Sequence, residues 1–408
     1  MALPIRIVHF ADLHIGMENY GRLDPETGLN LRVVDFLCRL DDVVAYAIDH
    51  EADVVLFAGD AFRTRRPSPT NQREFAQRIR HLADAGIPTV LLVGNHDVPV
   101  MTQRASSIEI FRTLGVPKVI VADRPDVHRV ETRRGTLQVA VIPYPVRQRL
   151  LTREQYRRMS QEELDRATTG AVVDAITGLG ARLTLGEPAI LMGHFSVGGA
   201  ELGSERSIMV GRDVTVPLSA LADAAWSYVA LGHIHHHQDL NAGSHPAVVY
   251  AGSLERVDFG EERQAKGFCW VEVTADEGRF TYVPLPARRF VTVRVDVRGN
   301  PDPLTAIETQ LRTRELGSAV VRLIVQMTAQ QEPLLRDTDL VPLLGDAFHA
   351  QINRDVDRAV RDRLDGVEPS ALTPELLLER YLAATGRDQA EVPAYLNAAR
   401  AIFAEDAA

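Results

Sequence analysis

The first hundred residues alternate between short apolar runs and longer amphipathic stretches, a pattern typical of alternating strands and helices. The apolar runs are short and end at glycine or polar residues, which indicates buried strands. The amphipathic stretches repeat apolar residues at three- and four-residue spacing, which predicts helices. We expect strands over residues 5–12, 53–60 and 88–97, and helices over 31–50 and 71–86. This alternation predicts an α/β fold with an at least partly parallel sheet that helices cover.

The pattern continues with more strands and changes character after Pro286. Residues 119–142 indicate further strands, and a polar helical segment around 152–178 precedes the apolar run 188–195. The 70 or so residues after Pro286 alternate between strand-like and helix-like segments, which predicts a small α+β module. A polar joint and two helical segments follow this module. The length of 408 residues suits two or three domains. The expected units are 1–286, 287–360 and 361–408.

Polar clusters close five of the apolar runs, namely ADLH, AGD, GNHD, GHF and GHIHHH. Ligands of open sheets collect at the carboxyl ends of strands, so we expect these clusters to meet at one edge. Their carboxylates, amide and imidazoles suit manganese, iron, zinc or magnesium rather than soft metals. The candidate donors are Asp12, His14, Asp60, Asn95, His194, His233 and His235. Seven donors exceed the needs of one ion and fit two ions that share a carboxylate, an arrangement that hydrolyses phosphate esters.

The spacing inside the clusters also favours a shared site. In ADLH and GHIH the donors stand two residues apart, so both side chains leave the same face of an extended segment. A lone DLH or GD carries little information, whereas the five clusters in this order are specific. His236 and His237 do not both fit the spacing, and we interpret them as surface residues.

The ordered motifs resemble those of the calcineurin-like metallophosphoesterase superfamily. RIVHFADLHIG, AGDAFRTRRPSPT, LLVGNHD, MGHFSVGG, LGHIHHHQ and YAGSLERVDFGEERQAKGF are similar to the SbcD-type DNA repair nuclease subunits, bacterial relatives of the meiotic-recombination nuclease. The resemblance implies a two-sheet sandwich flanked by helices, a DNA-facing cap at 287–360 and C-terminal helices that dock a partner. It also implies a metal-dependent exonuclease and endonuclease that acts at DNA ends and breaks, as a homodimer with an SbcC-type coiled-coil ATPase.

The resemblance further implies roles for single residues. One ion would be held by Asp12, His14, Asp60 and His235, and the other by Asp60, Asn95, His194 and His233. Mn²⁺ is the expected ion, with Mg²⁺, Fe²⁺ and Zn²⁺ as alternatives. His96 would face the substrate and stabilise or protonate the leaving oxygen. Asp97 would orient a histidine as a hydrogen-bond acceptor.

One position departs from the family pattern. Several members have a histidine three residues after the bridging aspartate, where this chain has Arg63 in GDAFR. Arginine can clamp a phosphate but cannot exchange protons near neutral pH, so the balance between exonuclease and endonuclease activity stays open. Arg63, Arg65 and Arg66 together are candidate DNA contacts, and the alternative is a solvated basic loop.

Composition and charge narrow the setting. The chain has 45% hydrophobic and 25% charged residues, which excludes disordered and fibrous classes, and its net charge of −10 means that DNA binding must rest on a local patch. Neither a secretory leader nor an apolar run of about 18 residues is visible, so we expect a cytoplasmic protein without a membrane partner. Cys38 and Cys269 lie far apart in apolar contexts, which predicts reduced core thiols.

Two other functions stay open at this point. A phosphatase or cyclic-nucleotide phosphodiesterase would use the same site but would not need the last two units. A non-catalytic subunit that binds DNA ends and docks the ATPase would tolerate a decayed site, whereas this donor set is intact. Leu376, Leu377 and Tyr381 stand at helical spacing and are candidate partner contacts, with packing on their own chain as the alternative.

Overall fold

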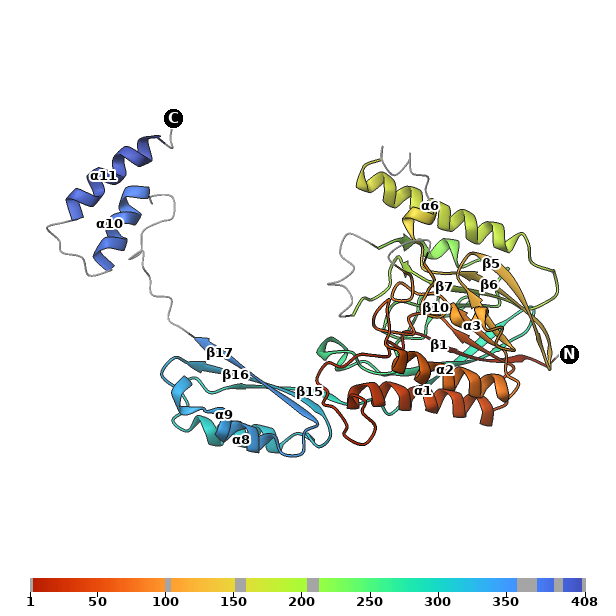
Figure 1. The fold of residues 1–408 in the computed structure, drawn as a ribbon, viewed down its shortest axis with the longest axis horizontal. Coiled ribbons are helices and arrows are strands. Elements are labelled where there is room, and N and C mark those ends of the chain that lie inside the picture. The colour runs from red at the N-terminus through yellow and green to blue at the C-terminus, as the bar shows by residue number, and fades with distance from the viewer. Residues whose placement is uncertain are drawn as a thin grey trace.

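Two stacked six-stranded sheets form the body of the molecule (Figure 1). The computed structural model describes residues 3–99, 104–150, 159–203, 213–357, 373–384 and 392–405. The first sheet has the order β14-β13-β1-β2-β3-β4, in which β1 to β4 are parallel and the hairpin β13–β14 is antiparallel. Its strands are β1 (Ile5–Phe10), β2 (Val54–Phe57), β3 (Thr89–Leu92), β4 (Val119–Ala122), β13 (Gly267–Val273) and β14 (Gly278–Pro284).

The second sheet has the order β11-β12-β10-β7-β6-β5, with four parallel central strands and an antiparallel strand at each edge. Its strands are β5 (Asp126–Thr132), β6 (Gly135–Ile142), β7 (Ala189–His194), β10 (Tyr228–Gly232), β11 (Gln238–Asp239) and β12 (Val248–Tyr250). A short pair, β8 (Ser196–Val197) and β9 (Thr215–Val216), lies outside both sheets. The inner faces of the two sheets enclose one apolar core of valine, isoleucine and leucine side chains.

Helices cover the outer faces of the sandwich. Helices α1 (Leu31–Asp49) and α2 (Pro69–Asp84) pack on the first sheet, and α6 (Gln161–Gly180) packs on the second. Each begins at a residue whose side chain accepts a backbone N–H of the first turn: Asn30, Ser68 and Ser160. The smaller elements are α3 (Ile110–Thr113), α4 (Arg147–Leu150), η1 (Leu218–Ala220) and η2 (Phe259–Glu261).

The C-terminal elements have their own core. Strands β15 (Phe290–Asp296), β16 (Val320–Thr328) and β17 (His349–Asp357) form a parallel sheet. One face of this sheet packs on α8 (Pro303–Arg312), α9 (Asp337–Leu340) and η4 (Val341–Leu344). η3 (Glu332–Leu334) follows β16, and the chain continues to α10 (Pro374–Ala384) and α11 (Val392–Glu405). The polar joint expected near residue 361 lies outside the described residues.

Two expectations from the sequence need correction. The five polar clusters do not close one sheet, because β1, β2 and β3 belong to the first sheet while β7 and β10 belong to the second. The clusters still meet, since the sheets face each other and their parallel strands end on the same side. Cys38 is exposed on α1 and is not a core thiol, whereas Cys269 is buried, and both are free.

Candidate metal centre

The site is built from the loops that follow five strands. Asp12 and His14 follow β1, Asp60 follows β2 and Asn95 follows β3, all from the first sheet. From the second sheet, His194 ends β7, and His233 and His235 follow β10. The structure brings all seven predicted donors together, and all are buried except the half-buried Asn95.

Asp60 lies at the middle of this cluster. Its Oδ2 atom is 3.7 Å from Nε2 of His14 and 3.5 Å from Nε2 of His194. Its Oδ1 atom accepts the backbone N–H of His96 at 2.8 Å. One carboxylate oxygen therefore faces donors on both sides, as a carboxylate shared by two ions would.

The remaining donors gather on the two sides of Asp60. On one side, the Nε2 atoms of His14 and His235 are 3.0 Å apart, and Asp12 groups with this pair within 4.8 Å. On the other side, Oδ1 of Asn95 is 2.9 Å from Nε2 of His194 and 3.0 Å from Nδ1 of His233. The cluster thus divides into two sets of donor atoms.

Outer acceptors fix the tautomers of three of the histidines. Nδ1 of His194 is 2.6 Å from the carbonyl oxygen of Ala58, and Nδ1 of His235 is 2.6 Å from Oε1 of Glu261. Nε2 of His233 is 2.9 Å from Oδ2 of Asp213. Because carbonyl and carboxylate oxygens only accept, these three nitrogens carry protons, and the other ring nitrogen of each histidine is the one that would bind an ion after losing any proton it holds. This is the arrangement that metal-ligating histidines require.

The charges of the cluster also fit divalent cations. Burial raises the pKa of Asp12, whereas His194 and His96 overcome the effect of burial and hold the pKa of Asp60 well below its usual range. Burial lowers the pKa of His194, but the Asp60 carboxylate outweighs it and raises that pKa to about 9. Within the described part of the chain, no arginine or lysine pairs with either carboxylate. Two buried carboxylates that face histidines and have no arginine or lysine partner favour a bound cation.

The backbone of the site is strained. Four of the donor residues have positive φ: Asp12 (52°), His14 (47°), Asp60 (63°) and His233 (98°). Non-glycine residues rarely adopt such φ values, and they cluster at functional sites. Glycine is needed beside them, because a Cβ on Gly59 would lie 2.4 Å from Nδ1 of His194.

His96 and Asp97 follow Asn95 on the same loop. Nδ1 of His96 is 2.5 Å from the carbonyl oxygen of Arg63, so Nδ1 donates this hydrogen bond. Nε2 does not take part in it. His96 also groups with His14 and Asp60 within 4.8 Å. Among the described residues, Asp97 has no histidine as a hydrogen-bond partner. Its buried carboxylate accepts hydrogen bonds from the backbone N–H groups of Asp60, Ala61 and Gly94 and from the hydroxyl of Ser107. Asp97 thereby holds two loops of the site together.

The basic loop after Asp60 is exposed next to the cluster. Arg63 donates to Oδ1 of Asn19 at 3.3 Å, and Nε of Arg65 donates to the carbonyl oxygen of Asn95 at 3.3 Å. Arg66 is exposed as well. All three predicted DNA contacts therefore lie on the loop that carries Asp60. The predicted partner contacts lie elsewhere, on α10, where Leu376 is half-buried and Leu377 and Tyr381 are exposed.

Sequence reasoning missed Asp213, Glu261 and Tyr144. Asp213 comes two residues before β9 and Glu261 ends η2, so neither stands at the carboxyl end of a described strand. Tyr144 had a signal, because it comes two residues after β6, another strand that ends on this side. Its ring centroid is 5.8 Å from that of His233, and burial and Asp213 raise its pKa to about 12, so it stays a phenol.

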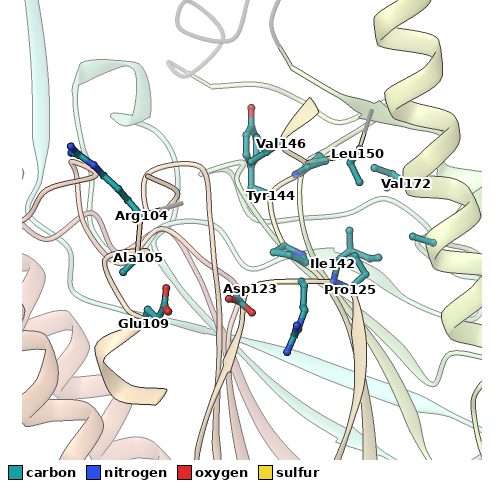
Figure 2. A pocket seen from close by; sticks show the side chains of 14 residues that line it. Arg104, Ala105, Glu109, Asp123, Pro125, Ile142, Tyr144, Val146, Leu150 and Val172 are labelled. Atoms are coloured by element: carbon teal, nitrogen blue, oxygen red, sulfur yellow. The ribbon is translucent and has the colours of Figure 1, made fainter. Parts of the chain in front are cut away.

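Tyr144 also lines a neighbouring cavity of about 490 Å³. Figure 2 shows Arg104, Glu109 and Asp123 on one side of this cavity and Ile142, Leu150 and Val172 on the other. None of the seven donors lines it, so the cavity adjoins the metal centre without containing it.

Three curated relatives are similar to much of this chain. The SbcD subunit of the nuclease SbcCD from Bacillus subtilis is 29% identical over 290 residues, which cover 67% of each chain. The DNA double-strand break repair protein Mre11 of Haloferax volcanii is 26% identical over 80% of this chain and 62% of its own, less than two thirds of its length. Mre11 of Halobacterium salinarum is 27% identical over 94% of this chain and 86% of its own. Each described helix is too short or too polar to cross a membrane.

A family profile matches the part of the chain that contains the site. The profile is described as calcineurin-like phosphoesterase and matches residues 5–237, a segment that includes all seven donors. Since this match covers more than half of the 408 residues, the chain belongs to the calcineurin-like phosphoesterase family.

Proposed function

We propose that this protein is a two-metal-dependent DNA phosphodiesterase, an exonuclease and endonuclease that acts at DNA ends and breaks as the nuclease subunit of an SbcCD-type complex. The observation that carries the proposal is the position of Asp60, whose Oδ2 atom lies between Nε2 of His14 and Nε2 of His194. The similarity to SbcD and Mre11 proteins supports DNA as the substrate and an SbcC-type ATPase as the partner.

The donor atoms define the proposed metal sites. Asp12, His14, Asp60 and His235 would hold one ion, and Asp60, Asn95, His194 and His233 would hold the other. We propose Mn²⁺ because the sets mix imidazoles with oxygen donors, whereas Mg²⁺ favours oxygen donors and water. When bound, two such ions acidify a water molecule and neutralise charge on the phosphate oxygens.

His96 is the proposed acid for the leaving group. The Arg63 carbonyl oxygen binds the Nδ1 proton, so Nε2 is the atom that donates to the leaving oxygen. Asp60 holds the backbone N–H of His96, which ties the position of the acid to the shared carboxylate. Asp97 acts indirectly, because its hydrogen bonds hold the two loops that carry Asp60 and His96.

Cleavage of end-labelled single- and double-stranded DNA with manganese, magnesium or chelator tests this function. We expect cutting with manganese and none with chelator. Hydrolysis of a small chromogenic phosphate ester without DNA cleavage would instead identify a phosphatase. Less than one bound equivalent of manganese after purification in manganese-supplemented buffer would favour a non-catalytic scaffold.

The three arginines after Asp60 are proposed to bind DNA phosphates. Replacing Arg63, Arg65 and Arg66 together by alanine should weaken DNA binding and lower the slope of log affinity against log salt by about 0.9 for each lost phosphate contact on duplex DNA. Filter binding at several salt concentrations measures both. The matched control replaces three exposed arginines that lie away from the donor loops, namely Arg80, Arg133 and Arg279. Equal slopes for the two triple variants would contradict the assignment.

The C-terminal units are proposed to have separate tasks. Residues 1–286 would form the nuclease, 287–360 a DNA-facing cap, and 361–408 the dock for the ATPase. Exposed Leu377 and Tyr381 on α10 support the last of these. Deleting residues 366–408 should abolish co-purification with the ATPase and leave manganese-dependent cutting intact. Loss of both properties together would contradict this division. The proposal also includes a cytoplasmic homodimer, for which light scattering on the full chain is the test.

A further inference from the structure

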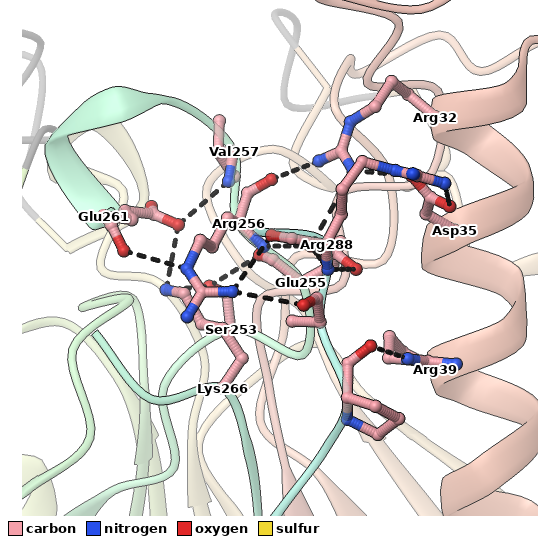
Figure 3. Close-up of polar contacts among 12 residues, drawn as sticks. Arg32, Asp35, Arg39, Ser253, Glu255, Arg256, Val257, Glu261, Lys266 and Arg288 are labelled. Carbon is pink, nitrogen blue, oxygen red and sulfur yellow. Dashed lines mark hydrogen bonds and ion pairs between the residues drawn. The ribbon is translucent and has the colours of Figure 1, made fainter. Parts of the chain in front are cut away.

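Glu261 is a buried carboxylate that touches the metal centre from outside. It ends η2 and is fully buried, and its Oε1 atom is 2.6 Å from Nδ1 of His235. Its Oε2 atom accepts the backbone N–H of Val257 at 2.9 Å and lies 2.8 Å from Nζ of Lys266. Figure 3 shows Glu261 between Val257 and Lys266. One carboxylate oxygen thus binds the ring of a proposed metal ligand, and the other binds the loop that supports it.

Lys266 is a buried cation with a full set of acceptors. It is 1% exposed and is one of only two lysines in the chain. Besides Glu261, its ammonium group donates to Oγ of Ser253 at 2.7 Å, Oε1 of Gln264 at 3.0 Å and the carbonyl oxygen of His235 at 3.2 Å. His235 is therefore held twice, by its ring through Glu261 and by its backbone through Lys266.

Burying a charged pair of this kind costs free energy, so stabilisation of the fold alone does not explain why the pair is present. Apolar residues of similar volume would often stabilise the fold equally well or better. A carboxylate that accepts the outer N–H of a ligating imidazole fixes its tautomer and orientation and makes the other nitrogen a better donor. The Lys266 ammonium group, 2.8 Å from Oε2 of Glu261, supplies the opposite charge that a buried carboxylate needs. Lys266 therefore supports Glu261 as the acceptor for the His235 ring.

We infer that Glu261 and Lys266 are a positioning pair for His235, which sets the affinity of the site that His14 and His235 share. This inference rests on the proposed two-metal centre. It predicts that the pair acts on one of the two ions, because the outer acceptors of His194 and His233 are Ala58 and Asp213.

Calorimetric titration of the metal-free full chain with Mn²⁺ tests the inference. The wild type should bind two Mn²⁺ ions. Glu261→Gln should lower the affinity for one ion about 10- to 100-fold and leave the affinity for the other unchanged. The matched control is Glu255→Gln, which makes the same change at a carboxylate of the same loop that is 1% exposed. Glu255 instead accepts the backbone N–H groups of Arg256 and Arg288, so both Mn²⁺ affinities should stay at their wild-type values.

A double variant guards against misfolding. Glu261→Gln with Lys266→Met removes both charges and leaves no unpaired ion in the interior, so it should fold even if the single variant does not. The double variant should show the same loss of affinity for one Mn²⁺ ion. Two wild-type Mn²⁺ affinities in the folded double variant would overturn the inference, whereas a wild type that binds no Mn²⁺ would overturn the proposed metal centre itself.

Discussion

The Asp60→Asn variant is expected to lose both bound ions and DNA cleavage together. Oδ2 of Asp60 faces His14 and His194 at 3.7 and 3.5 Å, so one substitution removes the charge that both donor sets share. A bound ion contributes several kcal/mol to stabilising the transition state, and each 1.4 kcal/mol is a factor of ten in rate. We therefore expect cleavage to fall about a thousandfold or more. Manganese content after gel filtration and cleavage of labelled DNA measure the two losses.

Asp53→Asn is the matched control for this experiment. Asp53 is another buried aspartate, and it precedes β2, the strand that Asp60 follows. It accepts from the backbone N–H of Arg6 and from the guanidinium of Arg134, away from the donor loops. This control should keep both ions and full activity. An Asp60→Asn protein that still binds two manganese ions would show that Asp60 does not bridge them.

The His96→Ser variant is expected to keep both ions and lose most of its cleavage. General acid catalysis contributes about 10²- to 10⁴-fold, and serine cannot supply the Nε2 proton. Manganese content and single-turnover cleavage on the same preparation separate the two properties. His236→Ser is the control, because His236 is adjacent to the proposed ligand His235, whereas its own Nδ1 lies 3.6 Å from exposed Glu201. If His96→Ser loses an ion as well, His96 is itself a ligand, as its position beside His14 and Asp60 allows.

The donor residues could be predicted from the sequence because each one follows a short apolar run. A buried parallel strand that ends in a polar cluster is a local signal, and residues such as Asp60 and His194 show it directly. The pair spacing in ADLH and GHIH is local as well. These signals need no knowledge of how the strands are ordered in the sheets.

The assembly around those donors could not be predicted in this way. Glu261 and Asp213 contact histidines that are 26 and 20 residues away along the chain, and β9 to β12 lie in the intervening segments. The hairpin β13–β14 returns to pair with β1, a contact between residues 267–273 and 5–10 that no local pattern encodes. Arg32 is fully buried in α1, although a charged residue gives no local sign of burial. Its partners are Asp35, one turn along the helix, and Glu255 and the carbonyl oxygen of Arg256, which are distant in the sequence.

The left-handed backbone of Asp12, His14, Asp60 and His233 has a consequence for how this protein tolerates change. Each such residue costs on the order of 1–3 kcal/mol, which the rest of the sandwich must offset. Glycine at any of these positions would relieve that cost while removing a donor. Selection for thermal stability alone would therefore favour glycine at these positions, with loss of donor side chains. We therefore expect activity and thermal tolerance to be opposed at these four positions.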